Sequence, residues 1–190
     1  MTQVKTRGRV VTRAVLRSLE VAGAAGSVIV APNMAQVIGK YLHHLDEKDA
    51  RRTLHYLKYH KLIEVRSVNG REEYRLTDPG SLRYKKIILS ELAIAMPRSW
   101  DKKWRVAVFD IPKYKQQQRN EFLLHLKRLG FYMLQRSVWV YPFECKEQIG
   151  VLLYSLDLEK EVSYMVVSDG NFTAHAELFF KNKGLLILPS

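Results

Sequence analysis

The sequence is poor in thiols. Its single cysteine, Cys145, cannot form an internal disulfide, and no second thiol is present to complete a metal or redox pair. We expect this side chain to be buried as a small apolar group. The composition therefore argues against a disulfide-stabilised protein and against thiol chemistry.

Long uninterrupted hydrophobic stretches are also missing. Residues 21–39 carry no charge, but glycine, serine, proline, asparagine and glutamine interrupt them, unlike the apolar stretch that spans a membrane. Closer to the N-terminus, Arg13, Arg17 and Glu20 break up the one candidate core of a signal peptide. We therefore expect a cytoplasmic protein without a membrane partner.

Acidic residues are scarce relative to basic ones. The chain of 190 residues has 31 Lys and Arg against 19 Asp and Glu, a net charge of +12. Residues 1–100 contain 18 basic and nine acidic side chains, whereas residues 101–190 contain 13 and 10. A positive excess of this kind favours polyanionic partners, so nucleic acid bound by the first half of the chain is the first hypothesis.

Hydrophobic periodicity predicts three helices in the first 60 residues. Residues 10–22 place apolar side chains on one helical face and arginines along another. Asn33 with Gln36 resembles a capping box and predicts the start of a second helix. The third is expected from about residue 46 to residue 60, burying Ala50, Leu54 and Leu57.

A hairpin follows the third helix. Residues 62–68 and 71–77 have strand character and flank Asn69-Gly70, a dipeptide that tolerates the positive backbone angles of a tight turn. Asp78 and Pro79 then supply an N-cap and a first-turn proline for a fourth helix through about residue 93. Residues 97–99 are expected to be a linker.

The second half alternates strands and helices. We predict a strand at 104–111, a helix at 115–129 ended by Gly130, strands at 131–135 and 137–142, a helix at 146–156, a strand at 161–168 and a last helix at 172–182. The βαββαβ part of this order is that of a ferredoxin-like domain. The predicted class is α+β. Its expected parts are a winged helix-turn-helix domain at 1–78, a connecting helix and linker at 79–101, and a ferredoxin-like domain at 102–190.

Three helices followed by a hairpin is the order of a winged helix-turn-helix, whose third helix enters the major groove of DNA. We expect Arg51 and Arg52 to read bases, because arginine can fork onto guanine, and Lys48, Lys58 and Tyr59 to contact phosphates. The full set of expected DNA-contacting residues is Lys48, Arg51, Arg52, His55, Lys58, Tyr59, Arg66 and Arg71. The alternative is that these charges form an ordinary solvated helix face.

A single acid ends one of the predicted buried strands. Asp110 follows a nearly unbroken apolar run and precedes a proline by two residues. Either this carboxylate binds a catalytic divalent metal, or it accepts backbone hydrogen bonds at the start of the next helix. It is the only carboxylate between Asp101 and Glu121, so a metal site needs acids from elsewhere in the fold or from a second subunit related by symmetry.

Two segments carry a family resemblance. WDKKWRVAVFDIP and, further on, RLGFYMLQRSVWVYP resemble the central domain of the PaaX family of transcriptional repressors. That domain is similar to the ferredoxin-like, dimeric CRISPR adaptation nuclease. The resemblance covers residues 100–142, and the preceding helices and hairpin match the PaaX plan. It implies a DNA-binding regulator that acts as a dimer.

The CRISPR relative implies roles for individual positions. Asp110 matches its metal-binding acid, Arg119 lies among the basic residues of its next helix, and Ser137 with Trp139 match its serine and aromatic residue. Two features differ from that relative. Met133 stands where it often has arginine, and the run Gln116–Gln118 replaces charged residues.

The leading hypothesis is a dimeric, PaaX-like transcriptional repressor that binds double-stranded DNA and needs no cofactor. Its small-molecule effector is unknown. The alternatives are a nuclease dependent on Mg²⁺ or Mn²⁺ at Asp110, and a CRISPR-complex subunit that binds nucleic acid without cleaving it. Residues 138–141 alternate valine with Trp139 and Tyr141, so the second sheet face either meets a partner or is covered by the protein's own helices.

Overall fold

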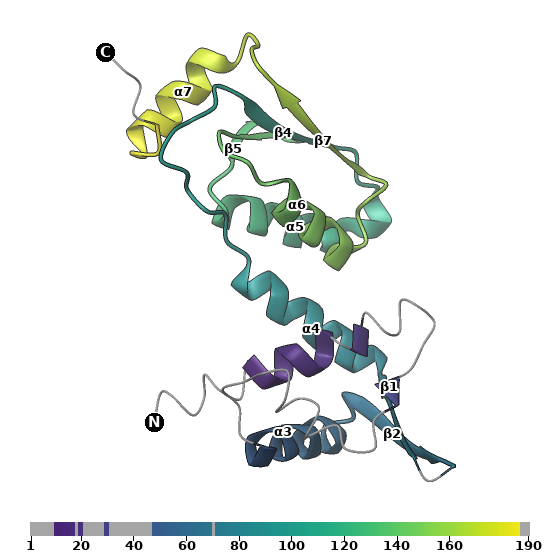
Figure 1. The fold of residues 1–190 in the computed structure, drawn as a ribbon. Helices are drawn as coiled ribbons and strands as arrows, with labels where there is room; N and C mark the ends of the chain where they lie inside the picture. The colour runs from purple at the N-terminus through teal and green to yellow at the C-terminus, as the bar shows by residue number, and fades with distance from the viewer. Residues whose placement is uncertain (1–9, 18, 21–28, 31–46, 70, 187–190) are drawn as a thin grey trace. The chain divides into compact units, whose positions relative to one another are not determined.

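The computed structural model describes residues 10–17, 19–20, 29–30, 47–69 and 71–186. The chain divides into two compact units, Met1–Ser90 and Glu91–Ser190 (Figure 1). Each unit has its own sheet and its own buried core, and each is described separately.

The first unit contains the predicted first and third helices and the hairpin. Residues 10–17 and 19–20 are helical, and α3 spans Glu47–Tyr59. The predicted helix beginning at Asn33 lies outside the described residues. The sheet has the order β1-β3-β2 and is antiparallel, with β1 at Ile29–Val30, β2 at Ile63–Val68 and β3 at Arg71–Leu76. This order, with a short first strand paired to the hairpin, is compatible with the expected winged helix, which stays a prediction.

The hairpin turn has the predicted position. Val68 pairs with Arg71, so Asn69 and Gly70 form a two-residue connection. Asn69 has a φ of 51°, in the left-handed region that asparagine tolerates better than most residues. The positive backbone angle expected at Asn69 is confirmed, while Gly70 lies outside the described residues.

The core of the first unit joins four elements. Residues from the first helix, α3 and the hairpin meet α4, which spans Asp78–Glu91. Tyr84 of α4 is buried in this cluster, and Ile87 and Ile88 pack against it. The other buried members are Val11, Val15, Leu16, Leu19, Ala50, Leu57, Ile63 and Tyr74. The helix after the hairpin is therefore part of the first unit's core.

The start of α4 differs from the prediction. Thr77, not Asp78, caps the helix, because its Oγ1 accepts a hydrogen bond from the backbone N–H of Gly80 at 3.1 Å. The same hydroxyl donates to the carbonyl oxygen of Lys61 at 2.7 Å. Thr77 thus links the start of α4 to the chain that enters the hairpin, while Pro79 still lies in the first turn.

The second unit has the strand order β5-β6-β4-β7, all pairs antiparallel. Its elements are β4 Trp104–Phe109, the short helix η1 Lys113–Lys115, α5 Gln116–Arg128, β5 Tyr132–Gln135, β6 Val138–Tyr141, α6 Lys146–Leu156, β7 Val162–Val167 and α7 Thr173–Asn182. With two helices crossing between the strands, this is the ferredoxin-like arrangement. The predicted α+β class is confirmed.

Helices lie on both sides of this sheet (Figure 1). Phe109 packs on Phe122 of α5, with ring centroids 5.4 Å apart, so the alternate side chains of β4 that share its face meet α5 and α6. On the opposite face Trp104 packs on Phe180 of α7 at 5.8 Å. The second face is therefore covered in part by the protein's own helix.

Other details of the second unit agree with the sequence. Gly130 ends α5 with a φ of 90°. Cys145 is fully buried, as expected for a small apolar side chain, and burial raises the pKa of its thiol to about 12. Among the helices in the described part of the chain, none combines the length and the apolar character needed to cross a membrane.

Gly80 offers a test of the packing between α4 and the hairpin. A Cβ at this position would lie 2.0 Å from the carbonyl oxygen of Leu62 and 2.7 Å from Cδ1 of Leu76. We expect Gly80→Ala to lower the free energy of unfolding of the first unit by about 1–3 kcal/mol, because backbone atoms must move apart. Circular dichroism follows both units, whereas tryptophan fluorescence follows only the second, which contains Trp100, Trp104 and Trp139.

Gly150→Ala is the matched control for this experiment. Gly150 lies in α6, and its added Cβ would meet no atom within 4 Å. Alanine is the better helix former by about 0.5–1 kcal/mol, so the second unit should become slightly more stable. Equal unfolding curves for Gly80→Ala and the unaltered protein would contradict the tight contact at Leu62.

Candidate functional site

The exposed face of α3 carries the residues that the sequence predicted to contact DNA. Ala50 and Leu57 are fully buried, Thr53 is 8% exposed, and Leu54 packs against the core. The remaining described side chains of the helix are outside this stripe. The exposed ones are Lys48, Arg51, Arg52, His55, Tyr56, Lys58 and Tyr59. The fold thus places six of the eight predicted residues on one surface.

The charges on the exposed face of α3 are distributed unevenly about the line that lies opposite the buried stripe. At 3.6 residues per turn, Lys48, Arg52, His55 and Tyr59 lie opposite the buried stripe. Arg51 and Lys58 lie along one side of that line, so this flank is cationic. Tyr56 lies along the other with Asp49, whose carboxylate is 3.6 Å from the Arg52 guanidinium.

The hairpin is less basic than the helix. Residues 61–76 contain four basic and three acidic side chains, and the Arg66 guanidinium is 3.2 Å from the carboxylate of Glu64 on the same strand. Both side chains of this pair are well exposed, so the attraction between them is weak in water. The side chain of Arg71 lies outside the described residues. A role for Arg66 and Arg71 in DNA contact stays a prediction.

Asp110 follows β4 directly and is exposed. Its backbone N–H donates to the carbonyl oxygen of Glu161 at 3.0 Å, which extends the pairing of β4 with β7 by one bond. Within the described residues, no three side chains of His, Cys, Asp or Glu are grouped closely enough to hold one metal ion. Metal binding by Asp110, alone or with a second subunit, stays a prediction.

A lysine lies close to this end of the sheet. Lys115 Nζ donates to Oε1 of Glu161 at 2.9 Å and to the carbonyl oxygen of Asp157 at 2.6 Å. The hydrogen bond to Glu161 raises the pKa of Lys115. The carboxylate of Glu161, the residue whose backbone pairs with Asp110, is thus already paired with a cation that the chain itself supplies.

The other positions matched to the CRISPR relative are in this unit. The Arg119 guanidinium lies over the ring of Phe109, 5.9 Å from its centroid. The carbonyl oxygen of Ser137 accepts a hydrogen bond from the backbone N–H of Phe109, and the Trp139 side chain is 2% exposed. In this structure these residues contribute to packing of the sheet, and their functional roles are untested.

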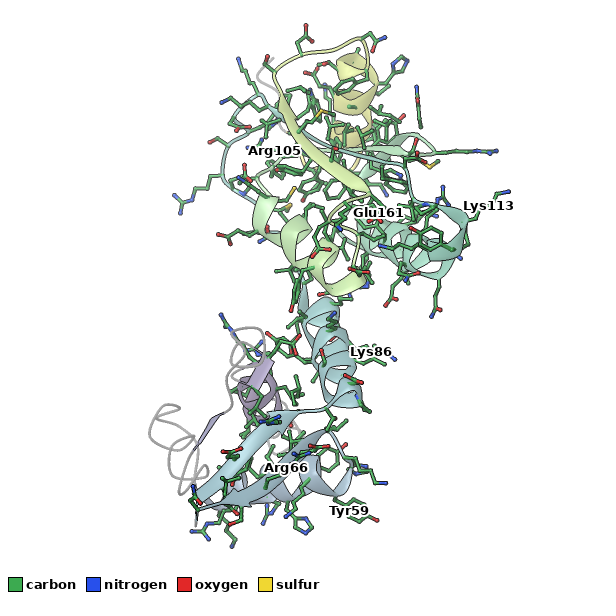
Figure 2. All side chains as sticks on the ribbon, turned by 90° about the vertical axis from the view of Figure 1, so that its right-hand side faces the viewer. Tyr59, Arg66, Lys86, Arg105, Lys113 and Glu161 are labelled. Carbon is green, nitrogen blue, oxygen red and sulfur yellow. The ribbon has the colours of Figure 1, made fainter. Side chains whose placement is uncertain are left out.

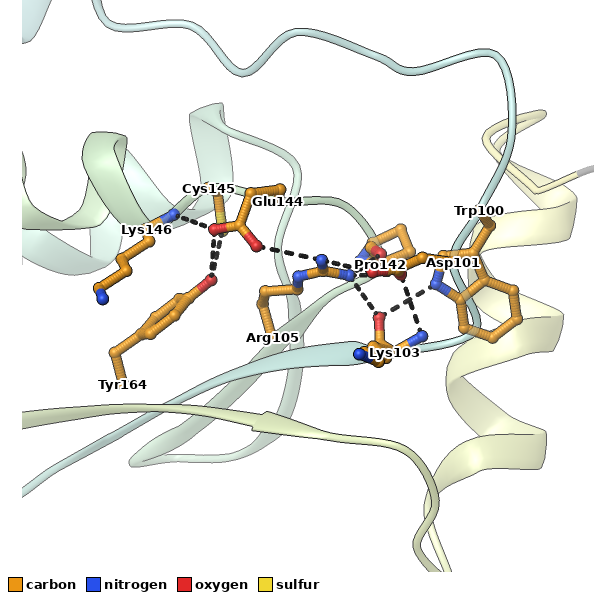
Figure 3. A network of polar contacts seen from close by, with 9 residues as sticks. All are labelled: Trp100, Asp101, Lys103, Arg105, Pro142, Glu144, Cys145, Lys146 and Tyr164. Atoms are coloured by element: carbon orange, nitrogen blue, oxygen red, sulfur yellow. Dashed lines mark hydrogen bonds and ion pairs between the residues drawn. The ribbon is translucent and has the colours of Figure 1, made fainter.

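A buried guanidinium organises the start of the second unit (Figure 3). Arg105 is 4% exposed and donates to both carboxylate oxygens of Asp101, at 2.6 and 2.7 Å. It also donates to the carbonyl oxygens of Lys103 and Pro142 and to Oε2 of Glu144. Hydrogen bonds from Arg105 lower the pKa of Asp101 below its usual value.

Glu144 continues the network toward α6. Its Oε1 accepts the backbone N–H of Lys146 at 2.9 Å, and this bond, followed by the contact with Arg105, lowers the pKa of the carboxylate. The hydroxyl of Tyr164 donates to the same oxygen at 3.4 Å. The network therefore ties the chain before β4 to the start of α6.

This network was not predicted from the sequence. An arginine inside an apolar strand, with an acid four residues earlier, was the available signal, because a buried guanidinium needs several acceptors. Trp100 marks the same segment, since its ring packs 4.8 Å from that of Trp104 and its Nε1 donates to the carbonyl oxygen of Lys103.

Residues 97–179 match the family described as the PaaX protein central Cas2-like domain. The match begins beside Trp100 and includes every strand of the second sheet and both helices that cross between them. This part of the second unit is similar to the PaaX central domain and is called the PaaX-type domain below. The resemblance noted in the sequence is confirmed for this domain.

A solved structure is distantly similar to the chain as a whole. An uncharacterized protein of Mycobacterium tuberculosis, Rv0674, is 16% identical in sequence, with a TM-score of 0.34. The aligned part covers 91% of this chain and 68% of that one. No curated protein matches the sequence significantly.

Acid should weaken the PaaX-type domain through the Arg105 network. The pKa values of Asp101 and Glu144 are lower in the folded protein than their ordinary values of 3.8 and 4.5. Their contribution to stability is therefore present above these ordinary values and is lost as the pH falls through the lower, folded values. Unfolding followed by tryptophan fluorescence should show a smaller free energy at pH 3 than at pH 7.

Arg105→Met separates this effect from general acid sensitivity. We expect the variant to lose about 1–3 kcal/mol of unfolding free energy at pH 7, because carboxylates and backbone carbonyls lose their donor. Its loss between pH 7 and pH 3 should be smaller than that of the unaltered protein. An identical pH dependence in both proteins would remove Arg105 as the cause.

Proposed function

We propose that the protein is a DNA-binding transcriptional regulator of the PaaX type, acting as a repressor. The observation that carries this proposal is the outward face of α3, where Lys48, Arg51, Arg52 and Lys58 are exposed together on a helix whose opposite stripe is buried. In a winged helix the corresponding helix lies in the major groove of the double helix. The PaaX-type central domain in the same chain supports a regulatory role.

The cationic side chains of α3 have two expected roles. Arg51 and Arg52 read guanine through paired hydrogen bonds, and Lys48 and Lys58 neutralise phosphates. The charge of the first half of the chain supports binding to DNA, since residues 1–100 have twice as many basic as acidic side chains. Binding releases counterions from the DNA, and this release is less favourable at high salt. The affinity should therefore fall steeply as the salt concentration rises.

Base reading can be distinguished from phosphate contact by mutation. Arg51→Ala or Arg52→Ala should cost about 1–3 kcal/mol at one preferred base pair and relax the selectivity there. Lys58→Ala should weaken binding to all sequences alike and reduce the slope of log K against log salt by about 0.9. Selection of bound sequences from random duplexes, followed by titration at several salt concentrations, measures both effects.

The base-reading assignment would be wrong if all three variants lost affinity equally for every duplex. Binding of the unaltered protein to random DNA without enrichment of any sequence would count against a regulator. Release of shortened fragments in the presence of Mg²⁺ would instead point to the nuclease alternative at Asp110.

We further propose that the PaaX-type domain joins two chains. α7 covers the sheet around Trp104, but on the same face Val108 and Val138 stay partly exposed and Met165 is 43% exposed. Cross-strand pairing places Val108 beside Val138, and Met165 beside the buried Val106. This apolar strip is suited to a second copy of itself, and a dimer would present two copies of α3 to the two halves of a palindromic site.

Met165→Asp tests the dimer. If the strip is an interface, a carboxylate buried there should raise the dissociation constant of the dimer by roughly 100-fold, measured by sedimentation. Met133→Asp is the control, because Met133 is 50% exposed but pairs with Trp139 and so lies on the other face of the sheet. A monomeric unaltered protein, or equal effects of the two variants, would exclude this interface.

A further inference from the structure

We propose that the end of α3 and the residue after it form a stacking site for unpaired DNA bases, so that the protein prefers duplexes with a single-stranded extension over blunt duplexes. The site consists of Tyr56, Tyr59 and His60 and is called the ring cluster below. This inference rests on the proposed function, because it places the ring cluster at one end of the helix that contacts the duplex.

The three rings are in contact and open to solvent. The centroids of Tyr56 and His60 are 4.3 Å apart with an interplanar angle of 51°, and Tyr59 meets His60 edge-on at 5.2 Å and 88°. Tyr56 is 46% exposed and Tyr59 76%. Figure 2 shows Tyr59 projecting outward from the helix. The flat surface of the Tyr59 ring is therefore accessible to a ligand.

The backbone beneath the ring cluster is fixed by hydrogen bonds. The N–H of His60 donates to the carbonyl oxygen of Tyr56 at 3.0 Å, and that of Leu62 donates to Leu57 at 2.9 Å. Lys61 closes the helix in the left-handed conformation with a φ of 54°. Its carbonyl oxygen accepts the hydrogen bond from Thr77. Rings held on such a frame lose little freedom when a ligand binds.

The chemistry around the ring cluster fits a nucleic-acid strand. Lys58 and Lys61 are exposed within three residues of Tyr59, and Arg52 lies one turn before Tyr56. Proteins that hold single strands combine aromatic rings, which stack on bases, with cations that follow the phosphates. The ring cluster beside these cations provides both groups.

An unpaired base is the ligand that the rings favour over a paired one. Inside a duplex both faces of each base are already stacked, and exposing one requires that it leave the helix. In a single-stranded extension the faces are available without that cost. Lys48, Arg51 and Arg52, nearer the start of α3, can hold the adjoining duplex while the ring cluster at the other end of the helix stacks on the extension.

The experiment compares one duplex in two forms, blunt and with about six added thymidines at either the 3′ or the 5′ end. Binding of the full chain is measured by fluorescence anisotropy of labelled DNA, and the readout is the ratio of the blunt to the extended dissociation constant. For the unaltered protein we expect at least one extension to give a ratio of roughly 5 to 150, the range of one stacked base.

Variants of Tyr59 assign this ratio to stacking. Tyr59→Ala should bring it close to one, whatever it does to the blunt duplex, whereas Tyr59→Phe should preserve it because the ring remains. Tyr114→Ala is the control, since Tyr114 is 81% exposed on η1 and has no ring contact among the described residues. The ratio should be unaffected in that variant.

The outcomes separate this inference from the proposed function. No binding to either form would overturn both. Sequence-selective binding to blunt DNA with a ratio near one would leave the regulator standing and exclude the stacking site. A large ratio that persists in Tyr59→Ala would show that the extension is bound elsewhere, which also overturns the inference.

Discussion

The narrow buried stripe of α3 is the constraint on which the functional surface depends. Ala50 and Leu57, seven residues apart, are both fully buried, so the helix can pack in only one rotation about its axis. A rotation by one residue would bring Arg51 into the core, where an unpaired guanidinium is strongly unfavourable. The apolar residues therefore determine which cations reach solvent, even though they contact no ligand themselves. The same relation allows the exposed positions to vary while the packing stays unchanged.

The PaaX-type domain treats its key cation differently from α3. It buries the charge of Arg105, whereas α3 exposes its cations to solvent. A guanidinium in a sheet is tolerated when most of its donors find acceptors, and here two carboxylates and two backbone carbonyls accept hydrogen bonds from its two terminal nitrogens, while the buried Nε has no partner among the described residues. These acceptors come from before β4 and from after β6. One side chain thus holds together segments that are far apart in the sequence. Hydrophobic contacts such as that of Trp100 with Trp104 complete the junction.

Much of the fold could be predicted because local signals agreed with the tertiary structure. The apolar period of residues 47–59, the Asn69-Gly70 turn and the glycine after α5 each follow from local backbone or packing requirements. The predictions failed where residues far apart in the sequence determine the structure. Thr77 caps α4 because the helix begins one residue earlier than the proline suggested, and Arg105 is buried because Asp101 and Glu144 meet it in space. The exposed residues of α3 followed from periodicity, whereas the contacts among its aromatic rings needed the structure.

The position of β7 at the edge of its sheet affects how the protein behaves in concentrated solution. Its six residues, Val162–Val167, contain neither charge nor proline, the features that usually keep an edge strand from pairing with another molecule. The nearest charges, Glu161 and Asp169, flank the strand, and Glu161 is engaged by Lys115. An uncovered β7 can therefore act as a template for edge-to-edge aggregation. Any assembly that shields this strand would also protect the protein from precipitation.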